Sequence, residues 1–425
     1  MSLISDPRVF LASLFDAAVK AADPRLQLAT HLPPKPKGRT IVVGAGKAAS
    51  QMAAALEAVW DGPISGIVVA RHGPVEPTKY INILQAAHPV PDEHGILGAQ
   101  ALLNAVHGLT ADDLVIALIS GGGSSLLPCP PDGLTLDDEI AVNRALLASG
   151  APISAMNVVR KHVSQIKGGR LALAAAPAKT VTFIISDIPG DNPAFVASGP
   201  TVPDRSTPQD ALEIIRLYKM DLPDAVFAHL NSPHAAAPRP SNPVFASNKV
   251  HIIASATVSL EAAAHEAERQ GVTAHILSDS FEGEAREVGQ LHAALAREVR
   301  NRNRPFTAPC VILSGGETTV TITGKDYGKG GRNTEFLLSF ALGIEDQTGI
   351  HALAADTDGV DGSEDNAGAF CDGSTTARMR RAGSNPKLLL SGHDAWNAFN
   401  ASGDLFVTGP TGTNVNDFRA ILLNY

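Results

Sequence analysis

The sequence predicts an α/β protein with two domains. The chain has 425 residues, which is more than one hydrophobic core usually holds, since chains tend to split into domains beyond about 250–300 residues. Short apolar runs of strand length alternate with longer segments of helical periodicity, and this alternation favours a mostly parallel sheet. Two apolar runs end in Ser-Gly-Gly, at residues 120–122 and 314–316. Because open α/β sheets bind ligands at the carboxyl ends of their strands, we expect two domains that face a shared cleft.

The first domain is expected to span residues 1–240. Alanine-rich segments with apolar residues at helical spacing predict one or two helices within 7–30, and a proline-rich turn at 33–38 precedes the first strand. Apolar, β-branched runs then predict strands, with periodic segments between them as helices. In chain order these are strand 40–43, a helix from 48, strands 65–70 and 81–85, a helix near 95–107, strand 114–119, helices within 137–175 and strand 180–185.

The second domain is expected to span residues 241–425. Residues 231–243 contain four prolines and little pattern, so we place the boundary there or shortly after. The alternation of strands and helices then continues through the second half. It predicts strand 250–254, helix 257–270, strand 273–277, helix 283–302, a strand from 311, helix 336–342, strand 351–355 and a late strand at 405–408.

Composition excludes several classes of protein. The net charge is −9 with no basic stretch, which argues against a nucleic-acid partner. No apolar run approaches the roughly 20 residues that span a bilayer, and the first residues lack the basic and apolar regions of a signal peptide. Three widely spaced cysteines without zinc-site spacing fit a reducing compartment. We therefore expect a cytoplasmic protein without a membrane partner, and the sequence leaves open whether it forms a homodimer.

The segment from Val311 to Phe336 combines two glycine-rich turns with positive charge. Glycines let backbone N–H groups approach an anion, and Arg332 could grip a phosphate or carboxylate with two parallel hydrogen bonds. The helix that follows would add its N-terminus as an anion site. The alternative to an anion-binding site is that these glycines only form two tight turns beside a hairpin. The candidate binding residues are Ser314, Gly315, Gly316, Glu317, Gly330, Gly331, Arg332 and Asn333.

Two further glycine-rich turns follow strands of the first domain. Gly44-Ala45-Gly46-Lys47 fits the dinucleotide-binding form G-x-G-x-x-G/A, but the acid expected about 20 residues later is absent and Arg71 follows the second strand. An NADP site is therefore an alternative. The P-loop pattern fails at Ile41 and Ala48, yet Lys47 at a helix start could hold a phosphoryl oxygen, unless it is simply an exposed lysine. The candidates here are Gly44, Gly46, Lys47, Ser120, Gly121, Gly122, Gly123 and Ser124.

Clustered aspartates indicate a cation site. Asp356, Asp358 and Asp361 lie on a glycine-rich turn after an apolar strand, where their charges repel unless a cation neutralises them. Mg²⁺ needs only one or two carboxylates together with phosphate oxygens and water. The alternative is a set of Asx turns that cap the loop. Asp187 and Asp191, which follow the strand at 180–185, pose the same question.

Asn157 and Lys161 belong to a polar, basic segment that is predicted to be helical. They are four residues apart and so share a face of that helix. They are candidates for binding substrate or phosphate, and a solvated helix face is the alternative.

Eight motifs occur in an order that is typical of a known family. They are Gly44–Lys47, His88–Asp92, Ile119–Ser125, Ser186–Asp191, Ser198–Thr201, Ser314–Glu317, Gly330–Asn333 and Asp356–Gly362. Together they span nearly the whole chain and resemble the glycerate 2-kinases of the MOFRL type. The resemblance implies a Rossmann-like N-terminal domain, a smaller α/β C-terminal domain, and an active site in the cleft between them.

The same resemblance implies an activity and its cofactors. Kinases of this type transfer the γ-phosphoryl group of ATP to the 2-hydroxyl group of D-glycerate, giving 2-phosphoglycerate and ADP, with Mg²⁺ or another divalent cation. The family's proposed active-site lysine and arginine fall on Lys47 and Arg332. Some members carry the name hydroxypyruvate reductase, so NAD(P)H-dependent reduction of hydroxypyruvate is the alternative function. The missing acid after the second strand argues against NAD in that role.

Overall fold

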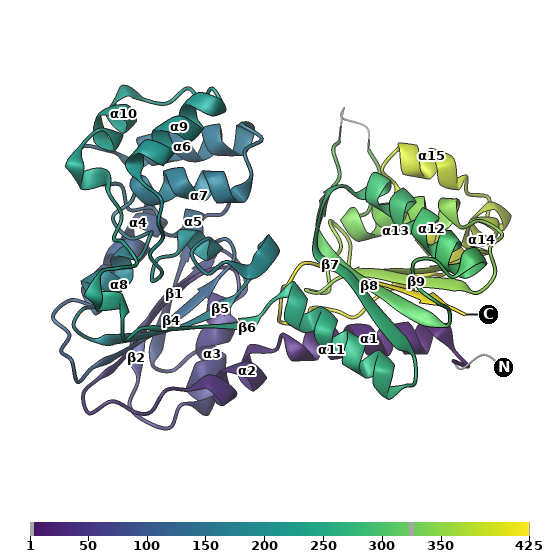
Figure 1. Ribbon diagram of the computed structural model, residues 1–425, viewed down its shortest axis with the longest axis horizontal. Coiled ribbons are helices and arrows are strands. Elements are labelled where there is room, and N and C mark those ends of the chain that lie inside the picture. The colour runs from purple at the N-terminus through teal and green to yellow at the C-terminus, as the bar shows by residue number, and fades with distance from the viewer. Residues whose placement is uncertain (1–3, 323–326, 425) are drawn as a thin grey trace. The chain divides into compact units, whose positions relative to one another are not determined.

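A computed structural model of the protein describes residues 4–322 and 327–424 (Figure 1). The chain forms two compact units. Unit A comprises Pro24–Ile253, and unit B combines the N-terminal segment up to Asp23 with Ala254–Tyr425. This division differs from the predicted one at 240/241, because the chain begins in unit B, passes through unit A and returns.

The first helix accounts for this difference. α1 (Pro7–Ala21) begins after Asp6, whose carboxylate accepts hydrogen bonds from the Arg8 and Val9 N–H groups. Its apolar stripe packs with α11 (Ala256–Arg269) and with the sheet of unit B, burying Phe10, Leu11, Leu14, Phe15 and Ala18. Helical spacing predicts the stripe, but the distant strands that cover it cannot be read from local sequence.

Unit A contains a six-stranded sheet in the order β3-β2-β1-β4-β5-β6. The registered pairs from β3 to β5 are all parallel, as predicted for a Rossmann-like domain. The order reverses between β1 and β4, which is the place where doubly wound folds bind ligands. The strands are β1 (Thr40–Ala45), β2 (Ser65–Arg71), β3 (Ile81–Ala86), β4 (Leu114–Ser120), β5 (Lys179–Ile185) and β6 (Lys249–Ala254).

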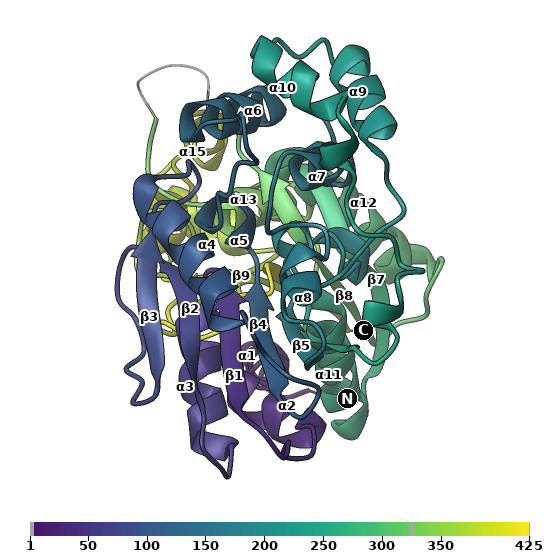
Figure 2. The ribbon, with the colours of Figure 1, turned by 90° about the vertical axis from the view of Figure 1, so that its left-hand side faces the viewer.

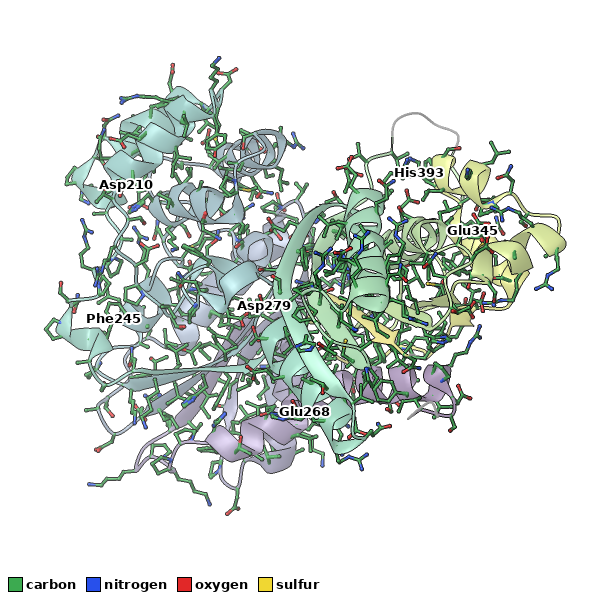
Figure 3. The ribbon with its side chains drawn as sticks, turned by 45° about the vertical axis from the view of Figure 1, so that its right-hand side comes forward. Asp210, Phe245, Glu268, Asp279, Glu345 and His393 are labelled. Carbon is green, nitrogen blue, oxygen red and sulfur yellow. The ribbon has the colours of Figure 1, made fainter. Side chains whose placement is uncertain are left out.

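Helices cover this sheet and form a separate group at one end of it (Figure 2). The group has its own apolar core, which includes Val142, Val159 and Ile215. Asp210, labelled in Figure 3, closes a capping box with Thr207 at the start of one of these helices. The helices of unit A are α2 (Pro24–His31), α3 (Ala49–Val59), α4 (Glu93–Ala105), α5 (Gly123–Leu126), α6 (Leu136–Ala148), α7 (Ile153–His162), α8 (Arg170–Ala174), α9 (Pro208–Leu217) and α10 (Asp224–Leu230).

Unit B contains a second six-stranded sheet, in the order β11-β10-β9-β12-β8-β7. Among the strand pairs of the described residues in this unit, β7 and β8 are parallel, and the pairs that involve β9 to β12 are antiparallel. The second half therefore does not repeat the parallel arrangement, because the unpredicted β12 inserts between β8 and β9. The strands are β7 (Thr273–Glu284), β8 (Cys310–Thr319), β9 (Ile350–Asp356), β10 (Gly368–Asp372), β11 (Leu405–Phe406) and β12 (Asp417–Leu423).

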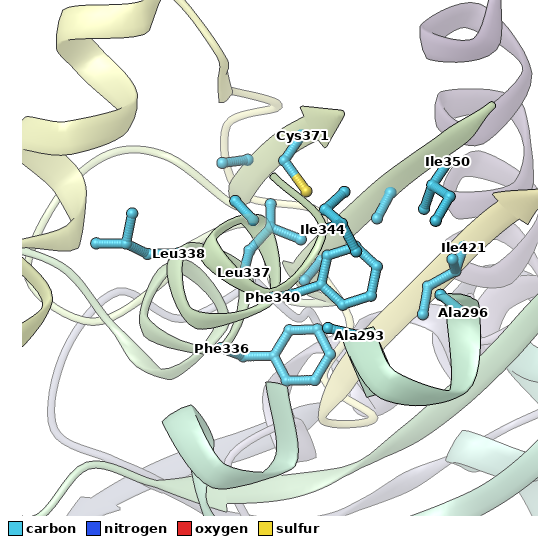
Figure 4. Close-up of a cluster of buried hydrophobic side chains, with 14 of the residues drawn as sticks. Ala293, Ala296, Phe336, Leu337, Leu338, Phe340, Ile344, Ile350, Cys371 and Ile421 are labelled. Atoms are coloured by element: carbon cyan, nitrogen blue, oxygen red, sulfur yellow. The ribbon is translucent and has the colours of Figure 1, made fainter. Parts of the chain in front are cut away.

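Helices cover both faces of this second sheet. Alternate residues of each strand point to opposite faces, so Leu313 and Phe418 pack with α1 and α11, whereas Ile312 and Ile421 pack on the other side with α12 (Ala285–Arg302) and α13 (Arg332–Gly343). Figure 4 shows Phe336 and Phe340 of α13 in the second of these cores. Three short helices complete the unit: α14 (Thr375–Arg381), α15 (Pro386–Ser391) and α16 (Ala395–Ser402). Across the described residues, no helix is long and apolar enough to cross a bilayer.

The predicted turn at Ser314-Gly315-Gly316 is wrong. These residues lie inside β8, where Gly316 pairs with Asp417 and Ser314 with Arg419. Gly316 has a φ of +124°, and a Cβ there would lie 2.2 Å from the Phe281 carbonyl oxygen of β7. The glycine thus permits the close approach of an irregular neighbouring strand rather than a phosphate-binding loop.

Candidate functional site

Two glycine-rich loops meet at the switch point of unit A. The Lys47 N–H donates to the Gly121 carbonyl at 2.8 Å, and the Ala48 N–H donates to Ser120 Oγ at 3.0 Å. Gly46 has a φ of +140°, and a Cβ there would lie only 2.1 Å from Ser120 Oγ. Gly46 must therefore be a glycine for the loop after β1 to lie against the loop after β4.

Charged and polar side chains gather around these loops. A Cβ built on Gly122 would lie 3.1 Å from Lys47 Cγ and 3.0 Å from His88 Nε2, so both side chains flank this glycine. A Cβ on Gly121 would lie 1.6 Å from Asp187 Oδ2, so a carboxylate from the end of β5 lies directly against it. Burial, and then the charges of Lys47 and Arg71, lower the pKa of His88 to about 4, which makes this ring neutral at pH 7.

These loops place a lysine, a carboxylate and backbone amide groups at the carboxyl ends of β1, β4 and β5. Such a set can hold the phosphates of a nucleotide together with a divalent cation. Asp191, the other predicted metal ligand of unit A, lies in the turn Pro189–Asp191 with a φ of +49°.

The structure gives Asn157 and Lys161 internal partners instead of a solvated face. Both are fully buried. Asn157 Oδ1 accepts a hydrogen bond from Ser198 Oγ at 2.6 Å, and Ser198 Oγ lies 2.7 Å from Ser124 Oγ. Lys161 forms an ion pair with Asp204. Asn157 therefore supports the start of α5, which carries Ser124, and Lys161 is committed to a structural ion pair.

In unit B, the guanidinium group of Arg332 contacts three carboxylates. Its Nε donates to Asp417 at 2.7 Å, Nη1 to Glu317 at 2.9 Å and Nη2 to Asp356 at 2.7 Å. The Arg332 side chain is 25% exposed. An arginine has five N–H donors, so these three contacts of the described residues leave two N–H groups for a ligand.

A buried ion pair between Arg419 and Asp417 holds Arg332 in place through Asp417. The spacing of residues in the sequence did not predict this pair. Arg419 is fully buried and donates to Asp417 Oδ2, while its guanidinium lies 4.8 Å from the centroid of the Phe336 ring. Asp417 also accepts hydrogen bonds from the Thr318 backbone and hydroxyl at 3.2 Å. The available signal was an acid and an arginine two residues apart in an otherwise apolar strand, which places both on one face.

Around Arg332, burial and the charges of neighbouring groups shift the pKa values of the side chains in opposite directions. Burial alone would lower the pKa of Arg332, but Asp417, Asp356 and Glu317 together raise it, so the guanidinium stays charged. Burial raises the pKa of Asp356. Burial would also raise the pKa of Asp417, yet Arg419 and Arg332 outweigh it and hold that pKa below its usual range.

Asp361 has a structural role in the start of α13. Its two oxygens accept hydrogen bonds from the backbone N–H groups of Asn333 and Thr334, at 2.9 and 2.8 Å, and from the Thr334 hydroxyl at 2.7 Å. A Cβ on Gly331 would lie 2.4 Å from Asp361 Oδ1, so Gly331 is required for this contact. Asp361 thus satisfies the free N–H groups of the helix start and fixes the position of Arg332.

The other aspartates of the acidic turn also engage protein donors. Asp358 accepts the Val360 N–H at 2.9 Å and the Asn414 side-chain amide at 3.3 Å. Asp356 accepts the Asp358 N–H at 3.1 Å in addition to its contact with Arg332. The turn therefore has the Asx geometry that was the alternative to a metal site.

His72, Asp92 and His94 form a second group in unit A, with one potential ligand atom from each within 4.8 Å of the others. Asp92 Oδ1 caps α4 by accepting the Gly95 N–H at 2.9 Å, while Oδ2 lies 3.4 Å from His72 Nε2 and 3.2 Å from His94 Nδ1. Imidazole nitrogens suit zinc and similar ions better than Mg²⁺. By ligand type this group therefore suits a transition-metal ion better than Mg²⁺.

Known proteins match this chain over nearly its whole length. A family model described as a domain of unknown function (DUF4147) matches residues 10–231, and the MOFRL family model matches residues 310–417. A protein of Agrobacterium vitis named putative hydroxypyruvate reductase is 53% identical over 98% of this chain and 94% of its own. The D-glycerate 2-kinase of Thermotoga maritima is 40% identical over 95% of this chain and 93% of its own. A crystal structure of a T. maritima glycerate kinase, 38% identical, gives a TM-score of 0.88 over 98% of this chain and 99% of that chain.

Proposed function

The chain belongs to the family of MOFRL-type glycerate kinases, and from this premise we propose that it phosphorylates D-glycerate at the 2-hydroxyl group with ATP, giving 2-phosphoglycerate and ADP. The observation that carries the proposal is the meeting of the two glycine-rich loops at the switch point between β1 and β4. Backbone N–H groups, Lys47 and the Asp187 carboxylate lie together there. These are the kinds of group that bind a nucleoside triphosphate with its cation.

Phosphoryl transfer depends mainly on positioning and charge stabilisation. We assign Lys47 to a phosphoryl oxygen, because a lysine at a helix start offers a compact positive charge. Arg332 is assigned to the equatorial oxygens of the transferring group, since two of its N–H groups remain available and Asp356, Asp417 and Glu317 fix its plane. Asn157 and Asp361 act as positioning residues for Ser124 and Arg332 respectively.

The name of the 53% identical relative makes reduction of hydroxypyruvate the second candidate function. Purified protein should be given ATP, Mg²⁺ and D-glycerate, with the product identified by phosphorus NMR, and in parallel hydroxypyruvate with NADPH. We expect 2-phosphoglycerate and no loss of the NADPH absorbance band. Formation of 3-phosphoglycerate would refute the regiochemistry, and oxidation of NADPH without release of ADP would favour the reductase.

Mg²⁺ or a similar ion would be held by oxygen donors at Asp187 and Asp191, because the Asp187 carboxylate lies against Gly121 of the glycine-rich loops. When bound, the ion would neutralise phosphate charge. EDTA is therefore expected to abolish activity and Mg²⁺ to restore it. Asp187→Asn should raise the Mg²⁺ concentration for half-maximal activity by roughly 10-fold or more, on the scale of a perturbed metal ligand.

Asp358→Asn provides the control for this prediction, because Asp358 belongs to the Asx geometry of the turn. Its Mg²⁺ requirement should match that of the wild-type protein. If Asp358→Asn raised the Mg²⁺ concentration needed for half-maximal activity and Asp187→Asn did not, the metal site would instead lie at the acidic turn.

We propose a cytoplasmic location because the cysteines form no disulfide. Cys129, Cys310 and Cys371 are all free thiols. Free thiols persist in reducing compartments, and Cys310 and Cys371 are buried in the core of unit B.

A further inference from the structure

The end of β2 and the start of α4 bring two histidines and an aspartate together. His72 directly follows β2, Asp92 is the N-cap residue of α4, and His94 lies in the first turn of that helix. One ligand atom from each of the three residues lies within 4.8 Å of the others. The group therefore offers two imidazole nitrogens and one carboxylate oxygen around a common point.

The fold holds the backbone that carries these side chains. The His72 N–H donates to the Ala86 carbonyl at 3.0 Å, which extends the pairing of β2 with β3 by one residue. Gly98 lets α4 lie close to β2, since a Cβ there would lie 2.7 Å from Val69 Cγ2. The end of β2 and the first turn of α4 are thus placed side by side by packing within unit A.

The distances around Asp92 match those of a shared metal ion better than those of direct hydrogen bonds. Its Oδ1 accepts the Gly95 N–H at 2.9 Å, while Oδ2 lies 3.4 Å from His72 Nε2 and 3.2 Å from His94 Nδ1. Charge-assisted hydrogen bonds from nitrogen to a carboxylate are shorter, at about 2.7–2.9 Å. Zn²⁺ binds imidazole nitrogen and carboxylate oxygen at about 2.0–2.2 Å, so neighbouring ligands of a tetrahedral site are about 3.3–3.5 Å apart. The two separations at Oδ2 are close to that length.

The two imidazole rings are free to complete such a site. Their centroids lie 5.7 Å apart and their planes are nearly perpendicular, at 84°. The His72 and His94 side chains are 53% and 67% exposed, so each ring can rotate onto an ion without disturbing the core. The remaining coordination position faces solvent, as in zinc sites with three protein ligands and a bound water.

We propose that His72, Asp92 and His94 bind one transition-metal ion of the Zn²⁺ class, with water completing its coordination. Two imidazole nitrogens and one carboxylate oxygen are typical ligands of such ions, whereas Mg²⁺ prefers oxygen. The proposal goes beyond the kinase function and uses neither of the aspartates assigned to Mg²⁺. Because the ion would join the end of β2 to the start of α4, its binding would stabilise unit A against unfolding.

Co²⁺ is a suitable probe, because its visible absorption reports coordination whereas Zn²⁺ is colourless. The full chain without an affinity tag should be titrated with Co²⁺ in excess Mg²⁺, which competes for oxygen-only sites. We expect one bound equivalent with the intense absorption of four-coordinate Co²⁺. Zn²⁺ should displace it, since Zn²⁺ binds such ligands more tightly, and should raise the Tm by a few degrees.

Three variants test the ligands one at a time. His72→Ala and His94→Ala should each weaken Co²⁺ binding by roughly 10-fold or more. Both should keep the Tm of the metal-free wild-type protein, because the two side chains are exposed. Asp92→Asn keeps a good N-cap residue for α4 but removes the charged ligand, so it should weaken binding to a similar extent without unfolding the helix.

His265→Ala is the matched control. His265 lies on α11, is 82% exposed and has one carboxylate, that of Glu268, 3.9 Å away. This variant and Asp187→Asn should both bind Co²⁺ as the wild-type protein does. Failure to bind an equivalent of Co²⁺, wild-type affinity in both His72→Ala and His94→Ala, or loss of the site in Asp187→Asn would overturn the proposal. None of these outcomes bears on the phosphorylation of glycerate, which the assay with ATP tests separately.

Discussion

Replacing Arg332 with alanine is expected to lower kcat/KM for glycerate phosphorylation by roughly 100-fold or more, the effect of removing one charge-stabilising donor. Arg332 is held by Asp417, Asp356 and Glu317, so its two remaining N–H groups are already oriented before substrate binds. Arg332→Lys should not restore the rate, because an ammonium group cannot replace a planar fork with five donors. Steady-state kinetics on both variants measure the effect.

Stability must be separated from chemistry in this experiment. Loss of Arg332 leaves Asp356 and Asp417 without one partner, and breaking a buried ion pair costs about 3–5 kcal/mol, less where a partner is partly exposed. Arg378 is a matched control, since its side chain is 24% exposed and is held by Asp372 and Asp404 elsewhere in unit B. Arg378→Ala should lose stability but keep its activity per folded molecule. Near-normal activity in Arg332→Ala would refute the assignment.

Lys47→Ala is the second change with a large expected effect. We expect kcat to fall on the order of 100-fold, because the transferring phosphoryl group loses a fixed positive charge beside the loop at Gly121–Gly122. The Tm should stay within a few degrees, since the contact that joins the two loops uses the Lys47 backbone and not its side chain. Kinetics and thermal unfolding on the same preparation provide both values.

Lys35→Ala is the control for Lys47. Lys35 belongs to the same unit, and its side chain is 54% exposed and paired with Asp61 on the surface. It should change neither kcat nor Tm appreciably, because exposed ion pairs contribute little. If Lys47→Ala instead lost several degrees of Tm while retaining specific activity, Lys47 would be a structural residue.

The elements of unit A and the location of its loops were predictable because the relevant signals are local. An apolar run followed by glycine marks the end of a buried strand, and the rule for open sheets places such ends at a ligand site. Lys47, Ser120 and Gly121 do lie together as this rule requires. The prediction failed at Ser314-Gly315-Gly316 because the same signal also arises where a glycine lets a neighbouring strand approach within β8.

The partners of charged residues were not predictable, since they depend on long-range contacts. Asp417 lies 85 positions from Arg332 in the sequence, and β12, which carries it, follows a segment without helical or strand periodicity. The spacing of Asn157 and Lys161 correctly predicted that they lie on a helix, but it did not indicate that their side chains are buried. Polar residues at helical spacing describe a solvated face and a buried hydrogen-bond network equally well.

The path of the chain through the two units has a consequence for folding during synthesis. α1 is made before unit A, but the strands that bury its apolar stripe follow only after the 230 residues of unit A. At a synthesis rate of about 5–20 residues per second, that interval is on the order of ten to fifty seconds. His31 and His251 stack near the two ends of unit A, with ring centroids 5.0 Å apart, so this insert can close on itself in the meantime. During this interval Phe10, Leu14 and Phe15 stay uncovered, so α1 exposes an apolar stripe that a ribosome-associated chaperone would shield.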